Sequence, residues 1–332
     1  MEGNLLQKRV NPKLPSNPLY SFNTLELLDH PQCLQGLQGY EPPPKSLLKK
    51  AQNNYFSKEL SRNLTYLDSP LNKAYRRTLF ECCTHIQQEG KKLTSKYCGY
   101  RWCNVCNRIR TAKLYNGYLK PLQELEQCYL VTSTIPNVKG GDLRESIREM
   151  LSTSTKIIRG LKRKNIKFNG LRKLECTYNF DNDDYHPHFH FSIEGRDTAL
   201  AFQREWLNRY PSANLLGQDI RIINDYSEVF KYVTKIVSKS KKGDYNIYVA
   251  ALDTIFRSMK NIRTFQTFGT IKKINEEIED LQSEQFEDIE PYDFVIWKWE
   301  QSDWVNMING KGLTNYEPDK EMIELTTEKM IV

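Results

Sequence analysis

Residues 185–193 read Tyr-His-Pro-His-Phe-His-Phe-Ser-Ile, and three of the five histidines of the chain fall in this run. Its aromatic and branched side chains favour a β-strand. On a strand, alternate residues share a face, so we expect His188 and His190 to point the same way while Phe189 faces the core. The run therefore predicts a strand that presents two imidazoles to one metal ion.

A second strand is predicted just upstream, at residues 171–179, and the Asp-Asn-Asp-Asp sequence at 181–184 is typical of a turn. A hairpin centred on this turn places Glu175 opposite one of the two histidines. Two imidazoles and a carboxylate with open coordination positions suit a catalytic divalent cation such as Mg²⁺, Mn²⁺ or Zn²⁺. The alternative is a buried salt bridge from Glu175 to Arg172 or Lys173.

The composition indicates a protein that is not embedded in a membrane. The chain has 332 residues, of which 39% are hydrophobic and 27% charged, and its mean hydropathy is -0.65. This length allows one main domain with appendages. We find no run of about 18 apolar residues, and residues 1–4 lack the pattern of a signal peptide. We therefore expect a cytoplasmic protein with no membrane association.

The charge is distributed unevenly along the chain. The net charge is +7, but residues 276–293 contain nine acidic residues and no basic ones, so the remainder carries +7 + 9 = +16. Such a surplus favours a polyanionic partner, nucleic acid first, although a basic surface can also be inert. The acidic stretch itself is interpreted as a solvated segment; a DNA mimic is the alternative.

The cysteines are grouped as metal ligands often are. There are eight in all, and in a cytoplasmic chain they argue for metal binding or packing rather than disulfides. Three thiols fall within nine residues, and a Cys-Cys pair ends 15 residues before the first of them: Cys82, Cys83, Cys98, Cys103 and Cys106. One thiol of the pair, or His85 in its place, would complete a tetrahedral structural Zn²⁺ site.

The order of predicted elements indicates an α+β fold. Strands are expected at 129–135 and 219–223, and helices at 143–164 and 198–209, on either side of the histidine hairpin. This predicts an antiparallel sheet with helices packed on it, plus a small N-terminal cysteine zinc-knuckle module. We divide the chain into an N-terminal arm and helical segment (1–80), a zinc-binding module (81–115), the main domain (116–273) and an acidic C-terminal segment (274–332).

A last predicted helix, at 227–239, carries a candidate nucleophile. Glu228, Tyr232 and Lys235 recur at i, i+4 and i+7 and so share one face. A tyrosine with a lysine one turn away and a metal ion opposite could attack a phosphodiester, because the cation favours phenolate and the metal polarises the phosphate. The alternative is a tyrosine at the rim of the core, since the chain contains 19 tyrosines.

Taken in order, these motifs resemble those of plasmid rolling-circle replication initiators, which belong to the HUH endonuclease superfamily and, in this class, use one tyrosine. The resemblance extends from about Cys82 to Lys272. The matching stretches are the cysteine knuckle ending at 103–108, Leu130–Asn137, Leu174–Asn179, the HUH motif itself at His186–His190, Glu228-x-x-x-Tyr232-x-x-Lys235, and Arg263 with Phe268–Lys272.

The resemblance implies the HUH-type fold and an enzyme that nicks DNA at the plasmid origin. Tyr232 would form a 5′-phosphotyrosine link and leave a 3′-OH primer. His188 and His190 would hold Mn²⁺ or Mg²⁺ with Glu175 as third ligand, and Glu228 would activate water for the terminating cleavage. The implied partners are single-stranded and double-stranded origin DNA, a host helicase and a host polymerase.

Two other functions are compatible with the sequence. An HUH transposase or mobilisation relaxase would share the metal ion and the tyrosine. Long insertions, a helicase domain or paired catalytic tyrosines would favour one of these enzymes over a replication initiator. Here Glu228 stands where a second tyrosine might be, and the nearby Tyr226 is expected to point away from Tyr232. A non-catalytic, zinc-dependent DNA-binding repressor with structural histidines would bind the origin without cleaving it.

Overall fold

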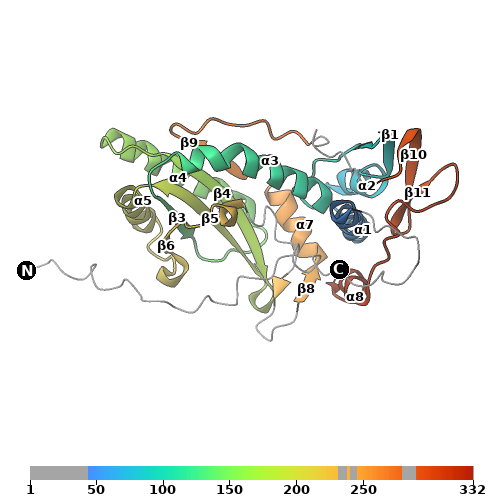
Figure 1. Cartoon of the computed structure of the whole chain (residues 1–332). Coiled ribbons are helices and arrows are strands. Elements are labelled where there is room, and N and C mark those ends of the chain that lie inside the picture. Colours follow the sequence, from blue (N-terminus) through green and yellow to red (C-terminus); the bar gives the residue numbers. More distant parts are fainter. Residues whose placement is uncertain (1–43, 231–237, 240–244, 279–288, 332) are drawn as a thin grey trace, which may run out of the picture.

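A computed structural model of the chain describes residues 44–230, 238–239, 245–278 and 289–331 (Figure 1). Its helices are α1 (Lys45–Thr65), α2 (Asn72–Phe80), α3 (Asn104–Gln123), α4 (Leu143–Arg163), α5 (Arg196–Arg209), α6 (Ser227–Phe230), α7 (Val249–Ser258) and α8 (Lys320–Thr326). Its strands are β1 (His85–Gly90), β2 (Lys92–Ser95), β3 (Cys128–Thr134), β4 (Gly170–Asn179), β5 (Asp184–Glu194), β6 (Asp219–Ile222), β7 (Ser238–Lys239), β8 (Tyr245–Tyr248), β9 (Phe265–Phe268), β10 (Tyr292–Glu300), β11 (Asp303–Asn306) and β12 (Met330–Ile331). None of these helices is long and apolar enough to cross a bilayer.

The largest sheet has five strands in the order β6-β3-β5-β4-β9, and each neighbouring pair is antiparallel. Its centre is the hairpin of β4 and β5, which turns through residues 180–183, with Asp183 in the left-handed region at a φ of 47°. In this hairpin Glu175 pairs with His188, and Lys173 pairs with His190. The predicted antiparallel sheet and its histidine hairpin are therefore confirmed.

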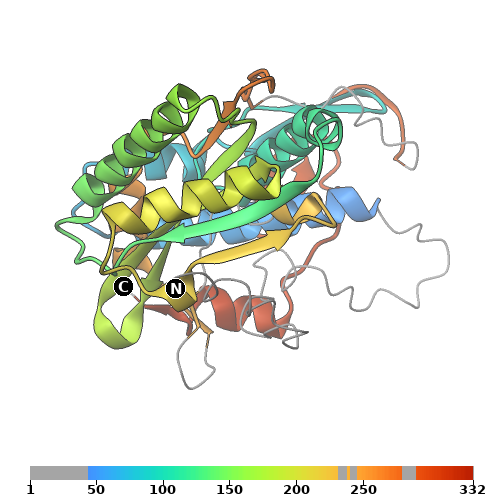
Figure 2. The same cartoon turned by 90° about the vertical axis from the view of Figure 1, so that its left-hand side faces the viewer.

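One face of this sheet is covered by α4 and α5, which lie side by side in Figure 2. The alternation of β5 turns Phe189 and Phe191 toward these helices. The Phe191 ring lies 4.5 Å from that of Phe202, and the Phe189 ring lies 5.8 Å from that of Trp206, both on α5. This packing fixes β5 from behind, so the histidines on its other face have a rigid support.

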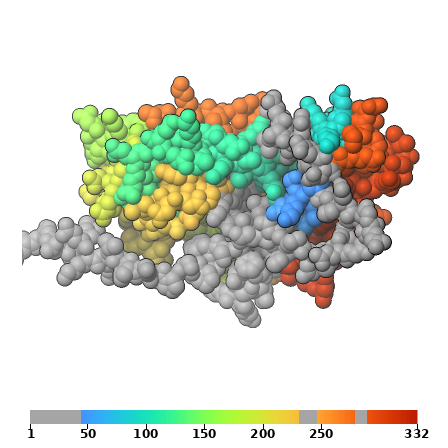
Figure 3. Space-filling model, viewed as in Figure 1, coloured from blue at the N-terminus to red at the C-terminus, as the bar shows by residue number. Residues whose placement is uncertain are grey.

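The histidine face of the sheet is covered at one end by α3 and α6. Tyr118 of α3 stacks on Phe230 of α6 with ring centroids 6.5 Å apart, and Phe230 stacks on Phe265 of β9 at 6.2 Å. Register places Phe265 beside Lys173, on the same face as the histidines. In Figure 3, α3 is the exposed teal-green ridge that runs between the cysteine region and this end of the sheet.

A second antiparallel sheet pairs strands from the N-terminal part of the described chain with strands from its C-terminal part. Its order is β11-β10-β1-β2, and Ile86 of β1 pairs with Trp297 of β10. The prediction that the cysteine module is N-terminal is wrong, because α1 and α2 precede it. The stretch predicted as an acidic C-terminal segment supplies β10 and β11, which complete the sheet that contains β1 and β2.

The other predicted elements of the main domain are confirmed within two residues, as β3, α4, α5 and β6. The prediction of a helix over 227–239 is wrong at its C-terminal end. Helix α6 is described only over Ser227–Phe230, and Ser238–Lys239 form a strand that pairs with β8. Tyr232 and Lys235 lie outside the described residues.

Candidate metal centres

The first candidate centre consists of Glu175, His188 and His190, whose potential ligand atoms all lie within 4.8 Å of one another. Oε2 of Glu175 lies 3.4 Å from Nε2 of His188 and 3.7 Å from Nε2 of His190. The three side chains come from two paired strands, and they are buried or half-buried. One carboxylate oxygen and two imidazole nitrogens thus converge on one point.

The second nitrogen of each imidazole is held by a neighbour. Nδ1 of His188 lies 3.0 Å from the carbonyl oxygen of His186. Because a carbonyl only accepts, this Nδ1 carries the hydrogen and leaves a lone pair on Nε2. Nδ1 of His190 lies 3.1 Å from the Thr132 hydroxyl on β3. Both rings are oriented for metal binding through Nε2, so the donor set fits a divalent cation that accepts nitrogen and oxygen ligands.

Lys173 binds the other oxygen of the same carboxylate. Its Nζ lies 2.5 Å from Oε1 of Glu175, and the lysine side chain is only 2% exposed. The buried salt bridge and the metal cluster, which the sequence presents as alternatives, therefore coexist on Glu175. Arg172 is not involved, because alternation turns its guanidinium to the opposite face, 5.0 Å from the centre of the Phe189 ring.

Lys173 holds Glu175 ionised, and burial holds His190 neutral. Burial by itself raises the pKa of Glu175, but the Lys173 ammonium and hydrogen bonds from the two histidines more than offset it, so this pKa lies well below its ordinary value. Burial lowers the pKa of His190 despite the neighbouring carboxylate. Both groups are thus in the protonation state that a metal ligand requires near neutral pH.

Glu228 lies at the start of α6 and is exposed. Its Oε2 lies 3.1 Å from Nη2 of Arg221 on β6. Tyr226 is half-buried, and burial together with a hydrogen bond to Cys128 raises the pKa of its phenol. A raised pKa disfavours the phenolate, so Tyr226 is a poor nucleophile.

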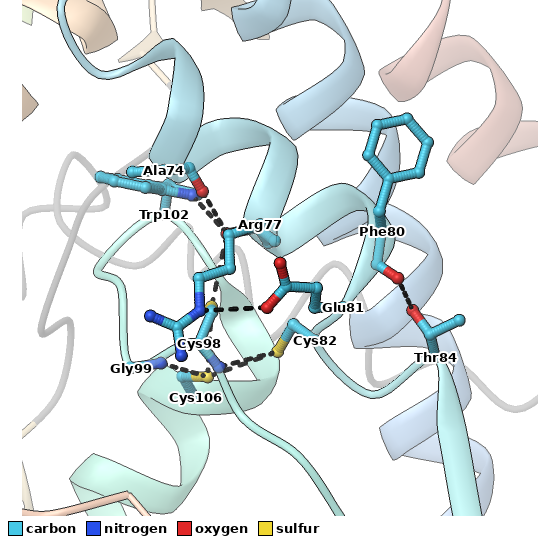
Figure 4. Close-up of polar contacts among 11 residues, drawn as sticks. Ala74, Arg77, Phe80, Glu81, Cys82, Thr84, Cys98, Gly99, Trp102 and Cys106 are labelled. Atoms are coloured by element: carbon cyan, nitrogen blue, oxygen red, sulfur yellow. Dashed lines mark hydrogen bonds and ion pairs between the residues drawn. The ribbon is translucent and has the colours of Figure 1, made fainter.

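The second candidate centre consists of four cysteines, Cys82, Cys98, Cys103 and Cys106. The Sγ atoms lie 3.6 Å apart in Cys82 and Cys103, 3.7 Å apart in Cys82 and Cys106, and 3.6 Å apart in Cys98 and Cys106. A tetrahedron with Zn–S bonds of about 2.3 Å has edges of about 3.8 Å. Figure 4 shows three of these side chains pointing toward one another, and the four thiols fit a structural zinc ion.

The structure selects Cys82 rather than Cys83 or His85 for this cluster. The backbone at Cys83 is left-handed, with a φ of 52°, and its carbonyl oxygen accepts a hydrogen bond of 2.7 Å from the Trp304 indole. His85 is exposed on β1. The turn at Cys83 thus directs two adjacent cysteines to different places, which spacing alone does not reveal.

Lys58 of α1 lies beside the cysteine cluster, a position that the sequence did not indicate. Its buried Nζ donates to the carbonyl oxygens of Leu79 and Cys82, at 2.8 and 3.2 Å, and to the Thr84 hydroxyl at 3.0 Å. Burial lowers the pKa of Lys58, and the nearby cysteines act in the opposite direction. A cation here offsets the negative charge of a tetrathiolate site.

The known proteins to which this chain is similar are replication proteins. A family model described as "Replication protein" matches residues 90–197, which include three of the clustered cysteines and the first candidate centre. The chain is 27% identical to "Protein rep" of Staphylococcus aureus over 205 residues, covering 60% of this chain and 88% of that protein.

Two Bacillus proteins, also named "Protein rep", are similar as well. The one from Bacillus sp is 30% identical over 171 residues, covering 46% of this chain and 56% of the relative. The one from Bacillus amyloliquefaciens is 27% identical over 181 residues, covering 50% and 53%. The chain thus spans about half the length of these two relatives. No solved structure matches it.

Proposed function

We propose that this chain, which is similar to replication proteins, initiates rolling-circle replication of a plasmid, and that it is a metal-dependent enzyme that nicks one strand of the plasmid origin. The observation that carries the proposal is the convergence of Oε2 of Glu175 with Nε2 of His188 and His190. Three ligands leave coordination positions for substrate oxygens. A structural role for the histidines does not require both Nε2 atoms to face one carboxylate oxygen.

In this proposal His188, His190 and Glu175 hold Mn²⁺ or Mg²⁺, which when bound polarises the scissile phosphate. The protein supplies the orientation: the His186 carbonyl and the Thr132 hydroxyl fix the rings before DNA arrives. Fixed ligands avoid the cost of ordering them during the reaction.

We assign the nucleophile to Tyr232, which follows α6. Phe230, two residues earlier, is buried between Tyr118 and Phe265 on the histidine face of the sheet, which supports this assignment. The Tyr232 phenolate oxygen would attack phosphorus while the bond from phosphorus to the 3′ oxygen breaks. The phenol proton passes to water, Lys235 stabilises the phenolate, and the leaving oxygen takes up a proton to become the 3′-OH.

Glu228 is proposed as the base that activates water in the terminating cleavage. The pairing of β6 with β3 places Arg221, the ion-pair partner of Glu228, on the histidine face of the sheet. Glu228 is exposed, so water can reach its carboxylate. A hydrolytic second cleavage releases the strand without a second covalent link to the protein.

The four-cysteine centre is proposed as a structural zinc site. Cys103 precedes α3 and Cys106 lies in its first turn, while Cys82 follows α2. A bound ion would therefore fix these two helices relative to one another. The proposed partners are single-stranded and double-stranded origin DNA, a host polymerase that extends the 3′-OH and a host helicase that opens the duplex.

The test is incubation of the purified protein with Mn²⁺ and short single-stranded oligonucleotides that tile the origin, followed by a denaturing gel and mass spectrometry. We expect a DNA adduct on the peptide that contains Tyr232, and no adduct with His188→Ala. Absence of cleavage across the tiling, with metal and DNA binding retained, would contradict the nickase and favour a DNA-binding repressor.

A further inference from the structure

Helix α2 has one exposed face that is separate from the candidate metal centres. Lys73, Arg76, Arg77 and Phe80 recur at i, i+3, i+4 and i+7, and all four are exposed. These side chains, with Asn72 and Glu81, line a surface hollow of about 420 Å³. In Figure 1, α2 lies at the end of the molecule that contains β1 and β10, away from the five-stranded sheet.

The inner face of α2 is held firmly in place. The Tyr75 hydroxyl donates to the Asp253 carboxylate at 2.6 Å, and the Trp102 indole donates to the Thr78 hydroxyl at 2.7 Å. At its C-terminal end the Leu79 carbonyl accepts from Lys58, and Cys82 enters the cysteine cluster. Figure 4 shows the Phe80 ring turned away from these sulfur atoms. The outer face is therefore presented on a rigid support.

The charge on this face is only partly neutralised. Arg77 forms an ion pair of 3.3 Å with Glu81. Within the part of the chain that the structure describes, neither Lys73 nor Arg76 has an acidic partner within 4.0 Å. Outside residues 276–293 the whole chain carries an excess of positive charge. Two cations one turn apart, neither with an acidic partner among the described residues, are suited to a polyanion.

We infer that the outer face of α2 binds double-stranded origin DNA, so that duplex binding and strand nicking occur at different places on the molecule. An α-helix that is free on one side fits the major groove, where Lys and Arg contact phosphates and guanine edges. Single-stranded DNA usually requires several aromatic stacking platforms, and this face exposes one ring. Protein interfaces are depleted in lysine at their centre. The identity of the DNA rests on the proposed function; the surface itself does not.

The test compares two double variants of the full-length protein. Lys73→Ala/Arg76→Ala removes the unpaired cations of α2. Its matched control is Lys156→Ala/Arg159→Ala on α4, which removes the same residue types at the same spacing from another exposed helix face. Binding is measured by fluorescence anisotropy with a labelled origin duplex over a range of salt concentrations. Nicking of a single-stranded origin oligonucleotide is measured in parallel.

We expect the α2 variant to bind the duplex about tenfold or more weakly at about 0.15 M salt and to lower the salt slope by about 1.8, because two phosphate contacts are lost. Its nicking of the short oligonucleotide and its melting temperature should match those of the wild type. The α4 control should bind the duplex normally. A normal affinity for the α2 variant, or a larger loss in the α4 control, overturns the inference.

Two further outcomes separate this inference from the proposed function. An equal loss of single-stranded and duplex binding in the α2 variant would show that the face is not a duplex site, and would also overturn it. His188→Ala should abolish nicking while leaving duplex affinity unchanged. If the wild type fails to nick but the α2 variant still loses duplex binding, the proposed catalysis is wrong and the α2 surface stands.

Discussion

Replacement of Lys173 by methionine should strengthen the binding of divalent cations while destabilising the metal-free protein. Lys173 is buried, and its Nζ lies 2.5 Å from the Glu175 carboxylate whose other oxygen faces the two histidines. In the metal-free protein this ammonium compensates the buried negative charge. In the metal-loaded protein it repels the incoming cation.

The magnitude follows from Coulomb's law. A single and a double positive charge about 5 Å apart repel by about 7 kcal/mol at an effective dielectric constant of about 20. Relaxation of the lysine and solvent screening reduce this repulsion, and we expect about 2 kcal/mol to remain, which corresponds to about 30-fold in affinity. Loss of one partner from a buried ion pair costs about 3 kcal/mol of stability. The metal-free variant should therefore melt at a lower temperature.

The assay is titration of the metal-free protein with Mn²⁺ by calorimetry, together with melting curves with and without Mn²⁺. Lys173→Arg is the matched control, because it retains the charge, and it should behave like the wild type in both measurements. For Lys173→Met we expect tighter binding and a larger increase in melting temperature on addition of Mn²⁺. Unchanged or weaker Mn²⁺ binding in a folded Lys173→Met protein would refute this electrostatic reasoning.

Four other predictions concern the proposed chemistry and the cysteine centre. Tyr232→Phe should abolish the covalent DNA adduct with little change in DNA affinity, as seen by gel and anisotropy; an adduct that persists moves the nucleophile elsewhere. Glu228→Ala should still nick but should hydrolyse a second origin site at least tenfold more slowly, and normal hydrolysis would remove its role. Cys103→Ser should lower the zinc content and the melting temperature, whereas Cys128→Ser, outside the cluster, should retain zinc; equal zinc content in both argues against the site. Burial lowers the pKa of His190, so below about pH 6.5 the histidine of the unfolded chain binds a proton first and the metal-free fold should lose stability. Mn²⁺ binding should persist at about pH 6. Loss of Mn²⁺ binding already at about pH 7 would contradict the lowered pKa.

Local pattern was enough to predict the histidine hairpin. Alternation along β5 and a turn of four Asp and Asn residues determine the register that places Glu175 opposite His188. The sequence left Arg172 and Lys173 as alternative partners of Glu175, and the structure selects Lys173, two residues before Glu175 on the same strand face. These relations span few residues, so strand periodicity defines them.

Long-range contacts were beyond what the sequence revealed. Nothing in the pattern around Lys58 indicates that it donates to carbonyl groups at the end of α2, and spacing does not distinguish Cys82 from Cys83. The choice between these cysteines depends on a left-handed backbone at Cys83 and on Trp304, which follows it by 221 residues. Such contacts depend on the tertiary fold rather than on periodicity.

The pairing of β1 with β10 has a consequence for the order in which the protein is made. Ile86 leaves the ribosome more than 200 residues before its partner Trp297, although domains generally fold as units during synthesis, beginning at the N-terminal end. The five-stranded sheet lies wholly between these strands in sequence and can form first. The edge of β1 that β10 occupies stays unpaired in the meantime, which is the state in which strands aggregate.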